Sequence, residues 1–257
     1  MTSTVADHYE QHLAPIYSWM VGDFEIACQK NSNFFDELDI PTKGIGRAVD
    51  LGCGHGLQTV ALAQRGFQVI SIDNSRILLD ELDRRASGLP VTPIHDDIIN
   101  FSKHVTGSVD LVVCMGDTLT HLREPADVSS VIGMSAKLLR AGGSLLVSFR
   151  DYSSTELEGL DRFIPVRADE TRIHTCFLEY AENVVNVHDI IQSRSSSGWH
   201  TEIGSYPKLR ISPDNVIGTA ANFKLENWHH SVREGMVYLA FGSDPKQLGY
   251  QDPDGNR

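Results

Sequence analysis

The chain has 257 residues, 41% of them hydrophobic, and a formal net charge of −12. This length and apolar content suit one globular domain that carries a sizeable insertion. The negative charge argues against a nucleic-acid partner, because phosphate binding needs clustered cations and the sequence has no stripe of lysine or arginine.

The cysteines and the N-terminus indicate the cellular compartment. Cys28, Cys53, Cys114 and Cys176 are widely spaced and form no Cys-x-x-Cys pair, so the sequence predicts neither a metal site nor a disulfide framework. Residues 1–10 are polar and contain no signal sequence, and no run of about 18 apolar residues follows them. We therefore expect a cytoplasmic protein with reduced thiols and no membrane partner.

The first forty residues predict a helical cover. Apolar and aromatic side chains recur there at helical spacing: Tyr9, Leu13, Ile16, Tyr17 and Met20. Pro15 should break or kink this helix, and a second helix is expected over 24–38. The segment either packs on a sheet as a plain cover or brings Tyr9, Tyr17 and Trp19 to the mouth of a ligand site.

Residues 48–56, Ala-Val-Asp-Leu-Gly-Cys-Gly-His-Gly, predict a buried strand and a glycine turn that opens a helix over 57–64. Glycine permits positive φ and lets a ligand approach the backbone, while the helix N-terminus directs amide groups at that ligand. The spacing departs from the dinucleotide fingerprint, because Leu57 stands where that fingerprint has its third glycine. Asp50 suits a cationic ammonium group better than a pyrophosphate.

Acidic residues follow the next two predicted strands. The strand over 66–73 ends in Asp73, where a carboxylate can accept hydrogen bonds from two ribose hydroxyls. The strand over 91–95 is followed by Asp96 and Asp97. A fourth, continuously apolar strand over 108–115 leads into Gly116–His121, and ligands of open α/β sheets lie off such carboxyl ends.

The second half of the chain changes from a parallel to an antiparallel pattern. The predicted elements are a helix over 127–139, a fifth strand over 143–149, three antiparallel strands over 172–180, 184–192 and 199–208, a helix that begins at Ser212, and a closing hairpin of 223–231 and 236–241.

Three features in combination resemble the class I S-adenosylmethionine (SAM) dependent methyltransferases that act on small molecules. They are the Asp-x-Gly-x-Gly-x-Gly turn, the strand-end Asp73, and the Leu-Arg-Ala-Gly-Gly stop before the fifth strand. The N-terminal segment is loosely similar to the glycine N-methyltransferase group. The resemblance implies an α/β fold: a seven-stranded Rossmann-like sheet with an N-terminal helical cover and an antiparallel β lid insertion.

The resemblance also implies a division of the chain and a cofactor. We expect the cover at 1–40, the SAM-binding core at 41–150, the lid at 151–211, the closing helix and hairpin at 212–242, and a loose tail at 243–257. The cofactor would be S-adenosyl-L-methionine, converted to S-adenosyl-L-homocysteine.

By this resemblance, the cofactor-binding residues are Tyr17, Trp19, Asp50, Gly52, Cys53, Gly54, Gly56, Leu57, Asp73, Asn74, Asp97, Ile98, Cys114 and Met115. In the family, the acid of the first strand helps to hold the methionine ammonium group, and an acid after the third strand accepts from the adenine amine. Asp97 is favoured for the adenine, because Phe101 then matches a family aromatic position, and Asp96 is the alternative.

Methyl transfer from a sulfonium is an in-line displacement, so the protein mainly aligns a nucleophile and excludes water. Candidates for a general base are Tyr9, Asp117, His121 and His174. Candidate substrate contacts are Arg150, Tyr152, Arg172, Tyr206 and Arg210. If two of the three arginines face the pocket, an acceptor with a carboxylate or another oxyanion is favoured.

The expected function is SAM-dependent methylation of a small molecule, at nitrogen, with no metal. One alternative is an O-methyltransferase for a hydroxyl or carboxyl compound. Another is a SAM-binding regulatory protein without turnover. A short-chain dehydrogenase is excluded, since no tyrosine has a lysine four residues later. Assembly into a homo-oligomer stays open at this level.

Overall fold

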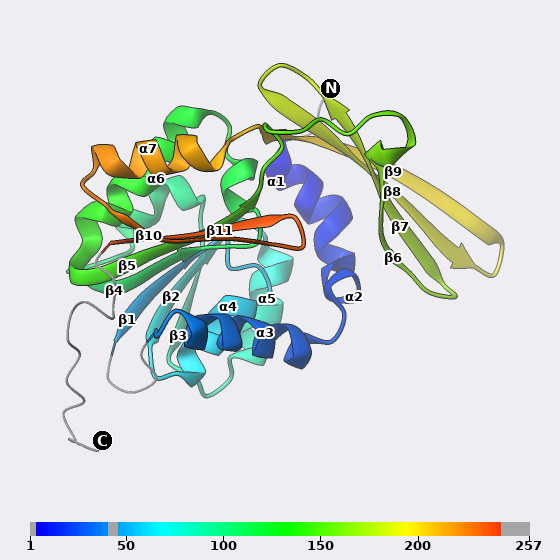
Figure 1. Cartoon of the computed structure of the whole chain (residues 1–257). Helices are drawn as coiled ribbons and strands as arrows, with labels where there is room; N and C mark the ends of the chain where they lie inside the picture. Colours follow the sequence, from blue (N-terminus) through cyan, green and yellow to red (C-terminus); the bar gives the residue numbers. More distant parts are fainter. Residues whose placement is uncertain (1–3, 41–45, 243–257) are drawn as a thin grey trace.

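The computed structural model describes residues 4–40 and 46–242, shown with their connecting segments in Figure 1. These residues form a seven-stranded sheet with helices on both faces and, beside it, a four-stranded antiparallel sheet. The predicted tail at 243–257 lies outside the described residues. Among the helices of the described ranges, none has the length and apolarity needed to cross a membrane.

The large sheet is the one expected from the strand pattern. Its strands are β1 (Arg47–Leu51), β2 (Gln68–Asp73), β3 (Val91–His95), β4 (Val109–Cys114), β5 (Leu139–Arg150), β10 (Asn227–Arg233) and β11 (Met236–Gly242). They lie in the order β10-β11-β5-β4-β1-β2-β3, and β11 is antiparallel to both of its neighbours. This order is that of class I methyltransferases, and the strand order reverses between β1 and β4, where ligands of such sheets bind.

Helices cover both faces of this sheet. One face carries α3 (Phe24–Glu37), α4 (Leu57–Gln64) and α5 (Arg76–Arg85), and the other carries α6 (Pro125–Leu138) and α7 (Pro213–Asn222). Alternate residues of β1 serve the two cores, since Ala48 packs with the first group and Val49 with the second. Short 3₁₀ helices come after β3, β4 and β5 in the chain, at η3 (Ile98–Lys103), η4 (Thr118–His121) and η5 (Gly159–Arg162).

The N-terminal cover is helical, as predicted, but it changes pitch along its length. It runs through α1 (Val5–His8), the π-helical η1 (Tyr9–Leu13), the 3₁₀ turn η2 (Ala14–Ile16) and α2 (Tyr17–Val21). The 3₁₀ turn η2 contains Pro15, which has no backbone N–H and so cannot donate a helical hydrogen bond. Leu13 and Ile16 are buried together with Tyr152 and Tyr206, so the cover bridges the core and the small sheet.

The small sheet has four strands, and the prediction of three is wrong. They are β6 (Phe163–Ala168), β7 (Arg172–Tyr180), β8 (Val184–Ser195) and β9 (Gly198–Leu209), paired in that order. The missed strand is β6, an edge strand in which every residue is exposed and Pro165 interrupts the pattern. With neither face buried, it has no alternation of polar and apolar residues for the sequence to reveal.

Gly56 gives the first test of this fold. Its φ is +103°, and a Cβ at this position would lie 2.4 Å from Cδ1 of the buried Leu82. Gly56→Ala should therefore lower the free energy of unfolding by about 1–3 kcal/mol, measured by urea denaturation. The control is Gly218→Ala inside α7, where no atom lies within 4 Å and stability should stay equal or rise by up to about 1 kcal/mol. Equal stabilities of the two variants would contradict the prediction.

Candidate cofactor and acceptor site

A cavity of ≈ 430 Å³ lies at the carboxyl ends of β1, β2 and β4, a size that suits an organic ligand. Six parts of the chain contribute to it: the N-terminal cover, the glycine turn, the loops after β2, β3 and β4, and the small sheet. The lining residues include Val5, Tyr9, Tyr17, Gly52, Gly54, Asp73, Asp97, Met115, Thr118, His121, Val184, Pro207 and Leu209.

The glycine turn and the tip of β2 are tied together by Asp73. One carboxylate oxygen accepts from the backbone N–H of Gly54 at 2.8 Å, and the other accepts from that of Ser75, also at 2.8 Å. Burial raises the pKa of Asp73, and these backbone donors oppose the rise. Each oxygen keeps lone pairs beyond those used here, so the fixed carboxylate can also accept from the hydroxyls of a ribose.

Asp97 is the acid that reaches the cavity after β3. Its side chain accepts from the backbone N–H of Ile99 at 3.1 Å and lines the cavity together with Ile98. The alternative, Asp96, is outside the lining and accepts from His104 at 2.7 Å, and this hydrogen bond lowers its pKa to about 2. Of the two acids that follow β3, Asp97 is therefore the one that lines the cavity.

Of the expected cofactor contacts, ten line the cavity: Tyr17, Gly52, Cys53, Gly54, Leu57, Asp73, Asn74, Asp97, Ile98 and Met115. The other four, Trp19, Asp50, Gly56 and Cys114, are outside the lining and make contacts elsewhere. Cys114 is fully buried within β4, and Gly56 packs against Leu82. Trp19 donates its indole N–H to Asp169 in the turn between β6 and β7.

The fourth exception is Asp50. Its carboxylate accepts from the Thr59 hydroxyl of α4 at 2.6 Å, and Thr59 also contacts Ser71 at 2.9 Å. Asp50 is 1% exposed, and burial raises its pKa to about 7. The predicted direct contact with a ligand ammonium group is therefore not what the structure places here. Asp50 instead connects β1 to α4 through its hydrogen bond with Thr59.

Aromatic rings form the other end of the cavity. The rings of Tyr9 and His121 line it, with centroids 5.2 Å apart, and Tyr206 packs behind both, at 5.9 Å and 5.8 Å respectively. Nε2 of His121 is buried and has no hydrogen-bond partner among the described residues. Burial, assisted by the nearby charge of Lys208, lowers the pKa of His121 to about 3, so the imidazole is neutral.

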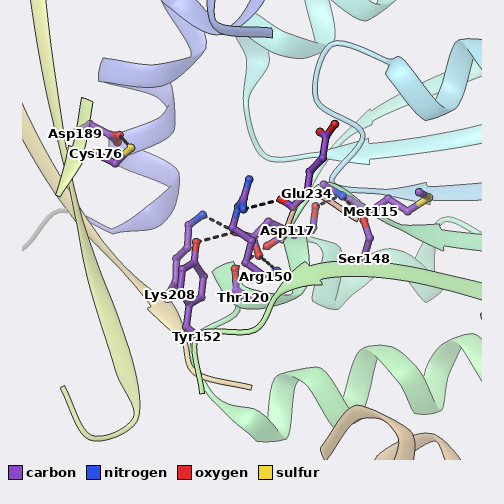
Figure 2. Close-up of polar contacts among 12 residues, drawn as sticks. Met115, Asp117, Thr120, Ser148, Arg150, Tyr152, Cys176, Asp189, Lys208 and Glu234 are labelled. Carbon is purple, nitrogen blue, oxygen red and sulfur yellow. Dashed lines mark hydrogen bonds and ion pairs between the residues drawn. The ribbon is translucent and has the colours of Figure 1, made fainter. Parts of the chain in front are cut away.

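Asp117 joins the core to the small sheet through Lys208 (Figure 2). It forms an ion pair with Lys208 of β9 at 2.6 Å, and it accepts from the backbone N–H of Arg150 at 2.9 Å and from the Tyr152 hydroxyl at 3.4 Å. Burial opposes the ionised form of Asp117, but Lys208 and the hydrogen bonds outweigh it and lower the pKa. The same pairing, together with neighbouring tyrosines, raises the pKa of Lys208 against the effect of burial.

The four candidate bases therefore separate into two groups. Tyr9 and His121 reach the cavity, whereas Asp117 is engaged with Lys208. His174 is outside the cavity lining, because it is buried within the small sheet and hydrogen-bonds Asp189 at 2.7 Å. Of the four candidate bases, Asp117 and His174 therefore lie outside the cavity lining.

The prediction of an arginine site for an oxyanion is also wrong, because Arg150, Arg172 and Arg210 are all outside the cavity lining. Arg210 donates to the backbone oxygen of Tyr152 at 3.1 Å, Arg172 lies over the Trp19 ring at 5.1 Å, and the Arg150 side chain is exposed. Tyr152 and Tyr206 are likewise buried behind the lining.

Sequence reasoning missed several lining residues. Some directly follow a recognised strand end and could have been included on that ground: His55, Gln58, Gly116 and Thr118. Others come from the small sheet and from the N-terminus: Val5, Val184, Pro207 and Leu209. These carry no local signal, since only the packing of the small sheet and the cover brings them to the ends of the core strands.

Comparisons with known proteins agree with this geometry. Residues 48–143 match a family described as "Methyltransferase domain". A glycine/sarcosine N-methyltransferase of Parasynechococcus marenigrum (strain WH8102) is 26% identical over 158 residues, which are 60% of this chain and 55% of that protein. A ubiquinone biosynthesis O-methyltransferase of Proteus mirabilis (strain HI4320) is 32% identical over 104 residues, 40% of this chain and 41% of that protein.

Among solved structures, the CcbJ methyltransferase from Streptomyces caelestis is similar with a TM-score of 0.74 and 17% identity, covering 91% of this chain and 97% of that chain. The chain spans about half the length of the curated relatives it matches. It contains a class I SAM-dependent methyltransferase domain, distantly homologous to glycine/sarcosine N-methyltransferases and ubiquinone biosynthesis O-methyltransferases. The cofactor of this family is SAM.

The first prediction from the site concerns Asp73. Asp73→Asn replaces a double acceptor by an amide whose NH₂ group faces donors, so SAM should bind about 10- to 100-fold more weakly in isothermal titration calorimetry. The matched control is Asp96→Asn, at the next strand tip but outside the cavity, which should leave the affinity unchanged. An equal effect of the two substitutions would show that Asp73 does not hold the cofactor.

The second prediction concerns the ion pair of Asp117 and Lys208. Lys208→Met leaves a buried carboxylate without its counter-ion and should cost about 3–5 kcal/mol of unfolding free energy, measured by urea denaturation. The double variant with Asp117→Asn should lose clearly less than the sum of the two single variants. As a control, Arg233→Met breaks an exposed pair with Glu37 and should cost no more than about 1 kcal/mol. Additive losses at Asp117 and Lys208 would contradict the coupling.

Proposed function

We propose that the protein transfers the methyl group of SAM to a nitrogen atom of a small molecule. One observation carries the proposal: a single cavity joins the Gly54–Asp73 end, suited to an adenosine, to the aromatic end formed by Tyr9 and His121. The two ends would hold donor and acceptor side by side. Such alignment is the main requirement of an in-line displacement from an activated donor.

In this reaction the nitrogen lone pair forms a bond to the methyl carbon, and the sulfur leaves with the electrons of the broken bond. The amine then loses a proton to water. Asp73 and Asp97 would position the adenosine, while Tyr9 and Pro207 of the small sheet would cover the acceptor and exclude bulk water.

The choice of nitrogen over oxygen depends on the state of His121. A neutral amine brings its own lone pair, so it needs no base within the cavity. A hydroxyl acceptor must lose a proton as it reacts, and a group whose pKa is held at about 3 is a weak base for that purpose. The neutral imidazole can still accept a hydrogen bond from an amine N–H and orient it.

Oxygen remains the second candidate because of one finding. The relative from Proteus mirabilis is by name an O-methyltransferase, and its matched segment is more identical to this chain than that of the N-methyltransferase relative. The curated relatives therefore support methyl transfer to either atom, whereas the weakly basic His121 at the aromatic end of the cavity favours nitrogen.

The test is a turnover assay of the purified full chain with SAM and matched pairs of acceptors, each pair an amine and an alcohol or carboxylic acid on the same carbon skeleton. Formation of S-adenosylhomocysteine and of methylated product is followed by mass spectrometry. We expect methylated amines only. Methylation of the oxygen compounds alone would favour the second candidate, and tight SAM binding without turnover on any pair would favour a regulatory protein.

The pH dependence gives a further prediction. With an amine acceptor from the panel, kcat/KM should rise with pH as the ammonium form of the unbound acceptor loses its proton, and the midpoint should follow the pKa of that acceptor. Because His121 is already neutral above pH 3, His121→Gln should lower the rate about 10-fold through lost orientation but leave this midpoint unchanged. A midpoint that shifts in His121→Gln, or that stays fixed when the amine is changed, would contradict the argument.

A further inference from the structure

A second group of chemically active side chains lies in the small sheet, away from the cavity. It consists of His174 and Cys176 on β7, Asp189 on β8, and His8 at the end of α1. Figure 2 shows Cys176 and Asp189 side by side, apart from the Asp117 group. His8, His174 and Asp189 are 0%, 2% and 1% exposed, so the group lies in the interior between the cover and the sheet.

The pairing of β7 with β8 brings three of these four side chains together. His174 and Cys176 are two residues apart on β7, so their side chains point to the same face of the sheet. Asp189 of β8 is the direct cross-strand partner of Cys176. His174, Cys176 and Asp189 therefore meet because of strand pairing, and a search for close cysteine spacing in the sequence does not detect them.

The N-terminal cover supplies the fourth side chain. His8 Nε2 lies 2.7 Å from one oxygen of Asp189, while His174 Nε2 lies 2.7 Å from the other. Gly204 makes room for His8, because a Cβ at that position would lie 2.3 Å from the imidazole Cε1. The small sheet thus has a space shaped for this histidine.

We propose that His174, Cys176 and Asp189 form a binding site for a zinc ion, and that His8 orients Asp189 through its hydrogen bond. An imidazole, a thiol and a carboxylate are donors that Zn²⁺ takes in proteins, and the sulfur selects against Mg²⁺ and Ca²⁺. Binding breaks the S–H bond of Cys176 and releases its proton to solvent. The thiolate and the carboxylate then carry two negative charges, which balance the two positive charges of the ion.

The distances support this assignment. The ligand atoms of His174, Cys176 and Asp189 all lie within 4.8 Å of one another. Zinc bonds of about 2.0–2.3 Å at tetrahedral angles place ligand atoms roughly 3.3–3.7 Å apart. Cys176 Sγ is 3.7 Å from His174 Nε2 and 3.1 Å from an oxygen of Asp189. The 2.7 Å contact of Asp189 with His174 is a hydrogen bond, which would lengthen as the ion replaces the shared proton. The hydrogen bond between His8 and the other oxygen of Asp189 would remain and orient the carboxylate.

Through the hydrogen bond between His8 and Asp189, a bound ion would also stabilise the contact between the cover and the small sheet. His8 is followed directly by Tyr9, which lines the cavity. The imidazole of His8 stacks on the ring of Tyr206, with centroids 4.5 Å apart. Holding His8 would therefore also hold the aromatic end of the cavity. The site is structural in this view, and its existence does not depend on which atom the enzyme methylates.

The experiment measures metal binding by the full chain. Metal-free protein is titrated with Co²⁺, a spectroscopic substitute for Zn²⁺, and zinc content after dialysis is measured by mass spectrometry. We expect one ion per chain, a near-ultraviolet charge-transfer band from the Co²⁺–thiolate bond, and the strong visible bands of tetrahedral Co²⁺. Zinc should displace the cobalt and raise the melting temperature.

Variants identify the ligands. Cys176→Ser should abolish the thiolate band, while Cys28→Ser, which changes a buried cysteine on α3, should keep it. His8→Gln should weaken zinc binding about 10- to 100-fold. Circular dichroism of each metal-free variant checks that it is folded, and the titration of the unmodified chain does not depend on any variant. Absence of a stoichiometric band in the unmodified chain, or an unchanged band in Cys176→Ser, would overturn the proposal.

Discussion

The buried ion pair between Asp117 and Lys208 connects the two sheets of this protein. Asp117 follows β4 at the edge of the core where ligands bind, and Lys208 belongs to the last strand of the small sheet. Both side chains are largely removed from water, so each charge depends on the other for its stability. This contact helps to hold the small sheet over the strand ends, beside the aromatic end of the cavity.

The two ends of the cavity are built in different ways. At the cofactor end, Asp73 is fixed by backbone donors from Gly54 and Ser75, which belong to consecutive elements of the core. At the acceptor end, rings from the cover, from η4 and from β9 meet through packing between separate parts of the chain. The two ends therefore differ in what fixes them, which is local backbone hydrogen bonding at one end and packing between distant parts of the chain at the other.

The proposed zinc site would act on the same acceptor end from the opposite side. The ion pair holds Lys208 of β9 against the core, whereas the His8–Asp189 contact holds the N-terminal cover against β8. Tyr206 lies between them, packed on His8 and on the rings that line the cavity. The acceptor end is thus fastened at two points, and neither point touches the cofactor end.

The sequence by itself determined the seven-stranded core, the glycine turn, and the acids at the tips of β2 and β3. These features depend on local periodicity and on turn chemistry, which neighbouring residues set. Only the tertiary structure decided where Asp50 points, that the three candidate arginines stay outside the cavity, and that Lys208 pairs with Asp117. It also decided that β6 is a strand and that His8 meets Asp189. The physical reason is that burial, charge pairing and edge-strand pairing depend on residues far away in the chain, which no local pattern records.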